Sequence, residues 1–208
     1  MLYRLFYTIS FLILSSILLA DKDHTNLLIY GDSISAGYGM DKDKQWSEEL
    51  QKILIEEKIS LTIINKSLSG ETTGGGLSRL EKIIDNSKPS YILIELGGND
   101  ALRGYPPAKI KNNIEEMINL SIEKGVKVLL MQIRILPNYG RRYQASFESL
   151  YKEISKENNI PLIPFMLNDI ALNKKLMLDD GIHPNATAQP LIAKFLYTNL
   201  LPLISEVD

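Results

Sequence analysis

Three polar residues of this chain have types and spacing suited to nucleophilic catalysis. Ser33 ends a Gly-Asp-Ser triplet after a short apolar run, and His183 lies near the other end of the chain. A hydroxyl becomes a good nucleophile when a base removes its proton, and imidazole can be that base near neutral pH. Asp180, three residues before His183, could bond to the second ring nitrogen and fix the tautomer. The other histidine, His24, lies close to the N-terminus, so we expect His183 to be the base.

Each of these residues also has a plainer structural interpretation. A lone Gly-Asp-Ser is more often a helix cap or a turn, and an isolated Asp-x-x-His is more often a surface turn or the start of a helix. Asp179 is a rival acid, one residue further from His183, and we expect it to face solvent. Further groups suited to the same chemistry are needed to favour catalysis.

Gly70 and Asn99 are such groups. Acyl transfer builds negative charge on the carbonyl oxygen, and each hydrogen-bond donor aimed at that oxygen contributes about 3–4 kcal/mol. Gly70 offers a backbone N–H with no side chain in the way, and Asn99 offers a side-chain amide. Each could instead be an ordinary turn residue. Their occurrence together with Ser33 and His183 favours an acyl-transfer site.

The elements that must position these residues follow from the apolar pattern. Five short apolar runs alternate with segments of helical periodicity, which predicts βαβ units and a mostly parallel sheet covered on both faces. Ligands bind at the carboxyl ends of such strands. The segments that contain Ser33, Gly70, Asn99 and His183 would meet at this edge. The proline in the fifth run predicts an edge strand. The expected strands span 27–30, 61–64, 91–96, 126–131 and 160–165, and the helical stripes span 46–54, 77–84, 110–118, 143–154 and 191–196.

Composition limits the class of protein. A chain of 208 residues is expected to form one domain with one core. It has no cysteine, which excludes disulfides, thiolate catalysis and cysteine-ligated metal sites. The formal net charge is -2 and the sequence has no dense Lys/Arg stripe, so we expect no nucleic-acid partner.

Residues 1–20 predict a secretory signal peptide, with Arg4 before a nearly continuous apolar run and Ala20 before a polar residue. An uncleaved N-terminal anchor is the alternative. Either interpretation places the folded domain, residues 21–208, outside the cytoplasm, periplasmic or secreted. We take a monomer as the default, in contact with a membrane only through a lipid substrate or an uncleaved N-terminus.

The segments GDSISAGYG, SLSGET, ELGGNDALRG and DDGIHPNA resemble the four signature blocks of the SGNH (GDSL-type) hydrolase superfamily. MQIRILPNYGRRY and QPLIA extend the resemblance to its bacterial periplasmic thioesterase I/lysophospholipase/arylesterase group, over nearly all of residues 26–203. The resemblance implies a flavodoxin-like three-layer α/β/α sandwich without a metal or cofactor. It implies Ser33 as nucleophile, His183 as base and Asp180 as triad acid, with an oxyanion hole formed by the Ser33 N–H, the Gly70 N–H and the Asn99 side chain.

The resemblance also implies substrate contacts in two segments. Residues 100–106 resemble a mobile loop that closes over acyl chains, and residues 135–138 resemble a segment that borders the acyl site. We expect Ala101, where relatives usually have glycine, and Pro106-Pro107 to stiffen the first segment. Ile135-Leu136-Pro137-Asn138 departs from the usual Leu-Pro-Ala-Asn, so the resemblance does not fix the chain-length preference. The expected substrate-binding residues are Asp100, Ala101, Leu102, Arg103, Ile135, Leu136, Pro137 and Tyr139.

The predicted function is hydrolysis of small-molecule acyl esters and thioesters, such as aryl esters, lysophospholipids or acyl-CoA. Two alternatives remain open. One is a carbohydrate O-acetyl esterase, although the apolar segment around 135–139 favours longer acyl chains. The other is a non-catalytic binding module on the same scaffold, which the complete set of reaction groups disfavours.

Overall fold

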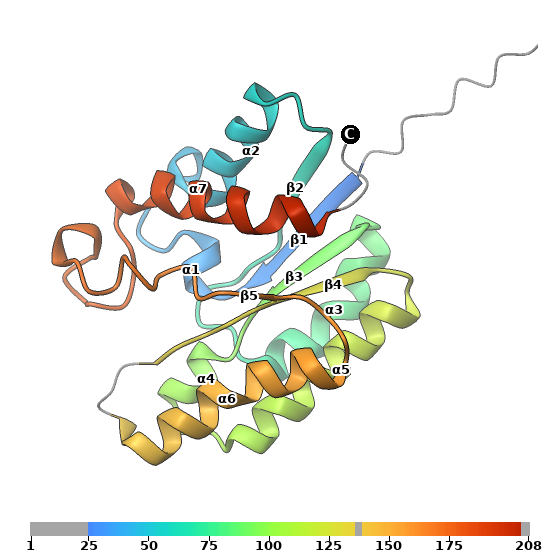
Figure 1. Cartoon of the computed structure of the whole chain (residues 1–208), viewed down its shortest axis with the longest axis vertical. Helices are drawn as coiled ribbons and strands as arrows, with labels where there is room; N and C mark the ends of the chain where they lie inside the picture. Colours follow the sequence, from blue (N-terminus) through green and yellow to red (C-terminus); the bar gives the residue numbers. More distant parts are fainter. Residues whose placement is uncertain (1–24, 136–138, 205–208) are drawn as a thin grey trace, which may run out of the picture.

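A parallel five-stranded sheet forms the centre of the computed structural model, which describes residues 25–135 and 139–204 (Figure 1). Its strand order is β2-β1-β3-β4-β5, and every neighbouring pair is parallel. The expected mostly parallel sheet is confirmed, with the fifth strand at an edge. The strands are β1 (Thr25–Gly31), β2 (Leu61–Asn65), β3 (Tyr91–Glu95), β4 (Lys127–Met131) and β5 (Leu162–Ile163).

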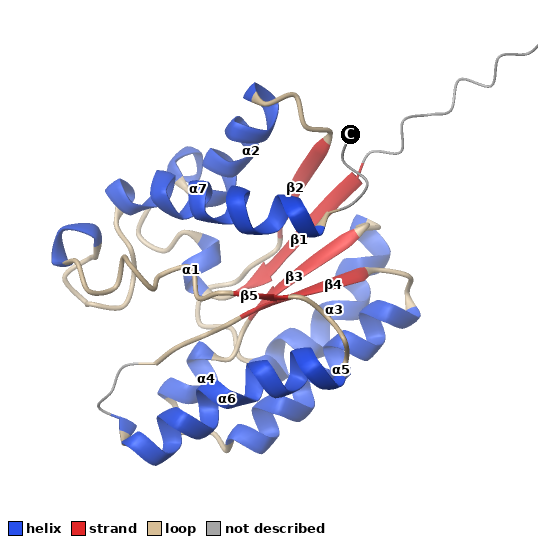
Figure 2. Cartoon of the chain, viewed as in Figure 1, coloured by secondary structure: helices blue, strands red, loops and turns tan. Residues whose placement is uncertain are grey.

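Helices cover both faces of the sheet (Figure 2). The helices α2 (Trp46–Glu56) and α7 (Gln189–Leu200) pack together on one face, and α3 (Thr73–Ser87), α5 (Pro107–Glu123) and α6 (Arg141–Glu157) lie on the other. Each buries most of the apolar stripe that the sequence predicted, and the exception in α7 is Leu191, which is 50% exposed. The three-layer α/β/α sandwich is therefore confirmed. The short helices are α1 (Ser33–Ala36) and α4 (Gly98–Leu102), with single 3₁₀ turns η1 (Lys42–Lys44), η3 (Lys174–Leu176), η4 (Ala186–Ala188) and η5 (Leu201–Leu203).

The sheet core explains the continuous apolar runs, because strands covered on both faces have no solvent-facing side. All five residues of β3 are buried, including Glu95. Trp46 and Gln189 are fully buried, and the Trp46 backbone N–H donates to Gln189 Oε1 at 3.0 Å, joining α2 to α7.

The strand order creates a switch point at β1. From β1 the chain crosses to β2 on one side, and from β2 it returns past β1 to β3 on the other side. In such sheets the connections diverge beyond the carboxyl ends of the central strands, leaving a crevice that binds ligands. Ser33 and Asn99 lie in the first turns of α1 and α4, directly after β1 and β3.

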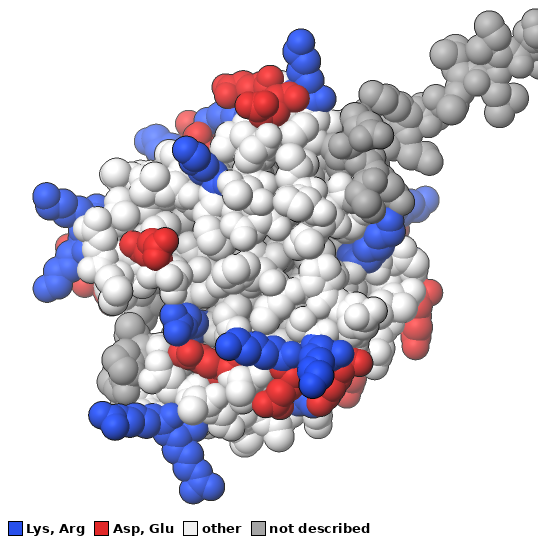
Figure 3. All heavy atoms as spheres, viewed as in Figure 1, with Lys and Arg blue, Asp and Glu red and all other residues white. Residues whose placement is uncertain are grey.

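Charges of both signs are interspersed on the face shown in Figure 3, over the described residues visible there. Within the described residues, no helix combines the length and apolar character that a bilayer crossing requires. The predicted signal peptide, residues 1–20, and His24 lie outside the described residues, so the predicted processing stays a prediction.

Gly97, which joins β3 to α4, tests how tightly this edge is packed. Its φ is 119°, and a Cβ there would collide with the Tyr151 hydroxyl, which donates to the Leu96 carbonyl at 2.9 Å. We expect Gly97→Ala to lower the free energy of unfolding by about 2–4 kcal/mol, from backbone strain and overpacking together. Gly125→Ala is the matched control, because Gly125 also has a positive φ but nothing within 4 Å of a Cβ. Urea denaturation should give the control a loss of only about 1–2 kcal/mol, and equal losses would contradict the packing argument.

Candidate active site

Ser33 is presented by a sharp turn between β1 and α1. Asp32 caps this helix, its Oδ1 accepting the Ile34 N–H at 3.0 Å. Gly31 precedes it, and a Cβ there would collide with Glu95 Oε2, so this tight approach needs glycine. The turn leaves Ser33 half-buried at the carboxyl end of β1.

Ser33, His183 and Asp180 form a continuous line of hydrogen bonds. His183 Nε2 lies 2.8 Å from Ser33 Oγ, and His183 Nδ1 lies 2.7 Å from Asp180 Oδ2. A carboxylate at Nδ1 favours the tautomer with its proton there, which leaves Nε2 free to accept the serine proton. Asp179 is exposed, and none of the described hydrogen bonds joins it to His183. The structure thus brings together the three residues that the sequence singled out.

The irregular segment that carries His183 is held by backbone and side-chain bonds. The Leu178 N–H donates to the His183 carbonyl at 2.8 Å, and Asn185 Nδ2 donates to the Lys175 and Met177 carbonyls. The Tyr38 ring packs against the imidazole with a centroid separation of 4.3 Å. These contacts fix the ring although the segment between β5 and α7 contains no α-helix.

Asp180 is kept ionised by its neighbours. Partial burial is the largest single influence and acts to raise its pKa, but the bonds it accepts outweigh this. Asp180 Oδ1 accepts the Ile182 and His183 N–H groups at 2.9 and 3.0 Å, and with the imidazole bond they lower the pKa of Asp180 to about 2. A carboxylate charged at every working pH suits the orientation of an imidazole.

The backbone N–H groups of Ser33 and Gly70 have no partner among the described residues, and Gly70 is not among the residues that line the cavity at Ser33. The Gly70 loop runs beside the end of β1, because the Leu68 N–H donates to the Gly31 carbonyl at 3.1 Å. Asn99 Nδ2 donates one hydrogen to Asp32 Oδ2 at 3.1 Å, which leaves its second hydrogen available. These are the groups expected to bind an oxyanion.

Arg79 clamps the loop that carries Gly70. Its Nε donates to Glu71 Oε2 at 2.6 Å and its Nη1 to the Lys66 carbonyl at 2.9 Å, so one guanidinium joins both ends of the loop. The guanidinium also lies over the Tyr30 ring, 4.3 Å from its centroid. The position of Gly70 is thereby tied to the sheet.

Two buried carboxyl groups lie beneath the Ser33 turn. Glu95 Oε2 accepts the Ser35 hydroxyl at 2.7 Å and the Asp32 N–H at 3.4 Å. Burial, followed by the adjacent charge of Asp32, raises the pKa of Glu95 well above its ordinary value of 4.5. Burial also raises the pKa of Asp32 to about 6, against the opposing bonds from Ile34 and Asn99 and the charge of His183. Burial thus favours the protonated form of both carboxyl groups.

A cavity of about 700 Å³ opens beside Ser33, Asn99 and His183. One part of its wall is polar and includes Arg134, which donates to Asn168 Oδ1 at 2.7 Å. The larger part is apolar, as an acyl chain requires. The apolar wall includes Leu102, Ile133, Ile135, Phe165, Leu167 and Met177.

Several of the expected substrate contacts lie away from this cavity. Leu102 and Ile135 line the cavity, but Asp100 and Ala101 are fully buried, with Asp100 bonded to Thr73. Arg103 is exposed and donates to the Gly70 carbonyl at 3.3 Å, and Tyr139 lies in a separate hollow beside Arg141 and Tyr143. A polar loop next to a site need not face it, and sequence pattern does not give that orientation. The expected contacts Leu136 and Pro137 lie outside the described residues.

Sequence reasoning missed the supporting residues Asp32, Glu95 and Arg79. Glu95 did leave a signal, because it is the single charged residue in the apolar run YILIEL. A charge inside a buried strand needs a partner or a raised pKa, and such groups cluster at functional sites.

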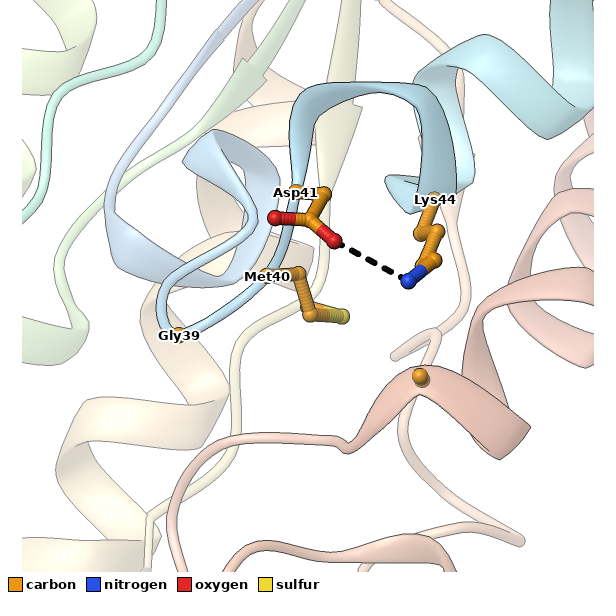
Figure 4. Close-up of a pocket in the computed structure, with 5 residues that line it drawn as sticks. Gly39, Met40, Asp41 and Lys44 are labelled. Atoms are coloured by element: carbon orange, nitrogen blue, oxygen red, sulfur yellow. Dashed lines mark hydrogen bonds and ion pairs between the residues drawn. The ribbon is translucent and has the colours of Figure 1, made fainter.

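Another hollow, of about 410 Å³, lies beside Gly39, Met40, Asp41 and Lys44 (Figure 4). Asp41 and Lys44 point toward each other and form an ion pair of 2.9 Å. The hollow has no hydroxyl or imidazole in its lining, so the candidate active site is the cavity at Ser33. The described residues contain no group of three or more His, Cys, Asp or Glu side chains that could hold a metal ion.

An α/β sheet with Ser33, His183 and Asp180 joined at its carboxyl edge, beside an apolar cavity, defines a serine hydrolase. The model of the GDSL-like lipase/acylhydrolase family matches residues 29–189. The chain belongs to this family.

The relatives agree with this assignment. The chain is 42% identical over 198 residues to an arylesterase of Vibrio mimicus, covering 95% of this chain and 98% of that protein. It is 39% identical over 196 residues to thioesterase 1/protease 1/lysophospholipase L1 of Escherichia coli K12, covering 94% and 92%. The crystal structure of esterase EstA from Pseudoalteromonas sp., inhibited by monoethylphosphonate, matches with a TM-score of 0.85 at 39% identity, covering 86% and 98%. Family and relatives give the chain an esterase or thioesterase function.

Asp180→Asn tests the orientation of the imidazole. An amide would present an N–H or a weaker acceptor to Nδ1 and favour the wrong tautomer, so we expect kcat to fall by about 10²–10⁴-fold. Asp179→Asn is the matched control and should retain kcat within about twofold, since exposed substitutions away from a site have small effects. Steady-state hydrolysis of p-nitrophenyl butyrate measures both, and equal losses would reject Asp180 as the orienting acid.

Glu95→Gln tests the buried protonated carboxyl. Because folding raises the pKa of Glu95, its contribution to stability is fully present below about pH 4.5 and is lost as the pH rises through the raised value. Glutamine cannot ionise, so we expect the Tm of the variant to rise relative to that of the parent as the pH increases from about 4.5 toward the raised pKa.

Thermal unfolding across this pH range measures the difference. Glu123→Gln is the control, since Glu123 is exposed and folding removes little of its solvent. A Tm difference for Glu95→Gln that stays constant with pH would show that Glu95 is not held protonated.

Proposed function

We propose that this chain hydrolyses carboxylic esters and thioesters of acyl chains through an acyl-enzyme on Ser33. The observation that supports this most directly is the line of hydrogen bonds from Ser33 Oγ through His183 to Asp180, 2.8 and 2.7 Å long, beside a largely apolar cavity. A nucleophile, its base and an orienting acid are the groups that acyl transfer needs.

In the first half of the reaction, Ser33 Oγ attacks the acyl carbonyl carbon while His183 Nε2 takes the hydroxyl proton. The carbonyl oxygen becomes an oxyanion, which accepts hydrogen bonds from the Ser33 N–H, the Gly70 N–H and Asn99 Nδ2. The bond to the leaving group breaks as His183 returns the proton to the departing alkoxide or thiolate. The products are an alcohol or thiol and the Ser33 ester.

In the second half, water replaces the leaving group. His183 Nε2 takes a proton from the water as its oxygen attacks the Ser33 ester, and the same donors bind the new oxyanion. Collapse releases the carboxylic acid, and the proton on His183 returns to Ser33 Oγ. Asp180, ionised throughout, stabilises the imidazolium in both halves.

The cavity wall supports acyl chains longer than acetyl. Leu102, Ile135 and Phe165 lie among its apolar residues, and such surfaces bind a chain at about 0.8 kcal/mol per buried methylene. Aryl esters, lysophospholipids and acyl-CoA are the proposed substrates. If residues 1–20 direct the chain to the periplasm or outside the cell, as proposed from sequence, lysophospholipids and other esters are more available there than acyl-CoA.

An acyl-length series of p-nitrophenyl esters, from acetyl to palmitoyl, tests this proposal on the parent and on Ser33→Ala. We expect activity to peak at medium or long chains and to fall in Ser33→Ala by about 10⁴-fold or more. Labelling with a fluorophosphonate, followed by peptide mass analysis, should place the adduct on Ser33.

The same series has outcomes that count against the proposal. Activity retained in Ser33→Ala would reject the mechanism. A preference for acetyl esters, above all acetylated sugars, would favour a carbohydrate O-acetyl esterase. No activity and no labelling in a folded parent protein would favour the non-catalytic binding module.

A further inference from the structure

The two loop donors of the proposed oxyanion hole start from strands that are not neighbours. Gly70 follows β2 and Asn99 follows β3, with β1 between them. Strands are spaced about 4.8 Å apart, so the ends of β2 and β3 are separated by about 10 Å. Both donors must reach one oxygen atom, so something beyond the sheet must hold the two loops in register.

A buried bridge joins these loops. Asp100, next to Asn99 in α4, accepts two bonds from Thr73, the first residue of α3 and three residues after Gly70. The Thr73 N–H donates to Asp100 Oδ2 at 2.8 Å, and the Thr73 hydroxyl donates to Asp100 Oδ1 at 2.6 Å. Asp100 and Thr73 are both 0% exposed. Bonds to a carboxylate are about twice as strong as neutral ones, and burial shields them from water.

A third residue orients the bridge. Asn113 of α5 donates its Nδ2 to Thr73 Oγ1 at 2.9 Å, so the oxygen of the hydroxyl is occupied and its hydrogen is directed to Asp100. The bridge is thus anchored to α3 and α5, two long helices that pack against each other on one face of the sheet.

The helix that carries Asn99 has few anchors of its own. The helix α4 has five residues and no side-chain cap at its N-terminus, whereas α3 has fifteen residues and a capping bond from Thr72. Short helices depend on tertiary contacts for their placement. Asp100 supplies such a contact from inside the protein, while Asp32 holds the Asn99 amide from the side of the nucleophile.

We propose that Asp100 is a positioning residue, which through its bridge to Thr73 holds the Asn99 amide where the oxyanion forms. This inference rests on the proposed function, because it takes Asn99 as an oxyanion donor. Asp100 itself touches no substrate, in contrast to the contact expected from the sequence.

Single substitutions at Asp100 and Thr73 test how much the bridge contributes to kcat. Displacing a catalytic group by about 1 Å can cost about 10²-fold, so we expect Asp100→Asn to lower kcat by about 30-fold with KM within about twofold. Thr73→Val, which lacks the hydroxyl, should lower kcat by about 5–10-fold, and Thr73→Ser, which keeps it, should restore kcat to within about twofold of the parent. Octaneboronic acid forms a tetrahedral anion on a serine. Its inhibition constant should therefore rise in each variant by about the factor by which kcat falls.

A double-mutant cycle with Asn99→Ala separates positioning from general stability. Asn99→Ala alone should lower kcat by about 10²–10³-fold. If Asp100 acts through Asn99, Thr73→Val and Asp100→Asn should each cost less than about threefold in the Asn99→Ala background. Ser121→Ala is the control for a lost buried hydroxyl, because Ser121 donates to the Met117 carbonyl at 2.7 Å within α5. It should lower Tm and leave kcat unchanged.

The outcomes distinguish this inference from the proposal beneath it. Losses that are additive with Asn99→Ala, or a loss of kcat in Ser121→Ala equal to that in Thr73→Val, would overturn the positioning role while Ser33 chemistry stands. Full activity in Asn99→Ala would overturn the oxyanion role of Asn99 and the positioning role with it. Because Thr73→Val is nearly isosteric, the test does not depend on whether Asp100→Asn folds.

Discussion

One buried carboxylate, that of Asp32, joins the two halves of the candidate site. Its Oδ1 caps the helix that begins at Ser33, and its Oδ2 accepts the amide of Asn99. A buried carboxylate needs a hydrogen-bond donor for each of its oxygens. If either the Ile34 N–H or the Asn99 amide moved away, one Asp32 oxygen would be left unpaired. The nucleophile turn after β1 and the donor helix after β3 are therefore fixed relative to each other. Glycine at position 31 leaves room for the neighbouring Glu95 carboxyl, whose pKa is raised by burial and by the charge of Asp32.

The carboxyl groups around the site have different roles because their surroundings differ. Asp180 is partly exposed and accepts N–H bonds, so its pKa falls to about 2 and it stays charged beside His183. Glu95 is buried next to another carboxyl, so its pKa rises and its neutral form is favoured. Asp100 is buried but satisfied by both polar groups of Thr73. The sequence presents all three simply as acidic residues.

The parts of this structure that follow from residue pattern could be predicted, and the parts that follow from side-chain direction could not. Buried parallel strands need continuous apolar runs, so the runs ending near Ser33 and Asn99 revealed the sheet and its active edge. Motif spacing then brought His183 and Asp180 into consideration. Asp100 was expected to contact substrate because it follows Asn99, but one residue of helix turns a side chain by about 100° and carries it into the core. For the same reason the sequence did not reveal the role of Arg79, or that Tyr139 lies in a separate hollow.

Ser33 and the proposed oxyanion donors come from one half of the sheet, and much of the cavity wall comes from the other half, as do His183 and Asp180. Ser33, Gly70 and Asn99 follow β1, β2 and β3, whereas Ile133, Ile135, Phe165 and Leu167 follow β4 and β5. The buried bonds of Asp32 and Asp100 lie within the first half, so wall residues after β4 and β5 such as Ile135 and Phe165 can change in sequence without disturbing them. Such a division makes the protein evolvable. New chain lengths can be explored by changing wall residues in these loops, while the nucleophile and the proposed oxyanion donors are inherited intact.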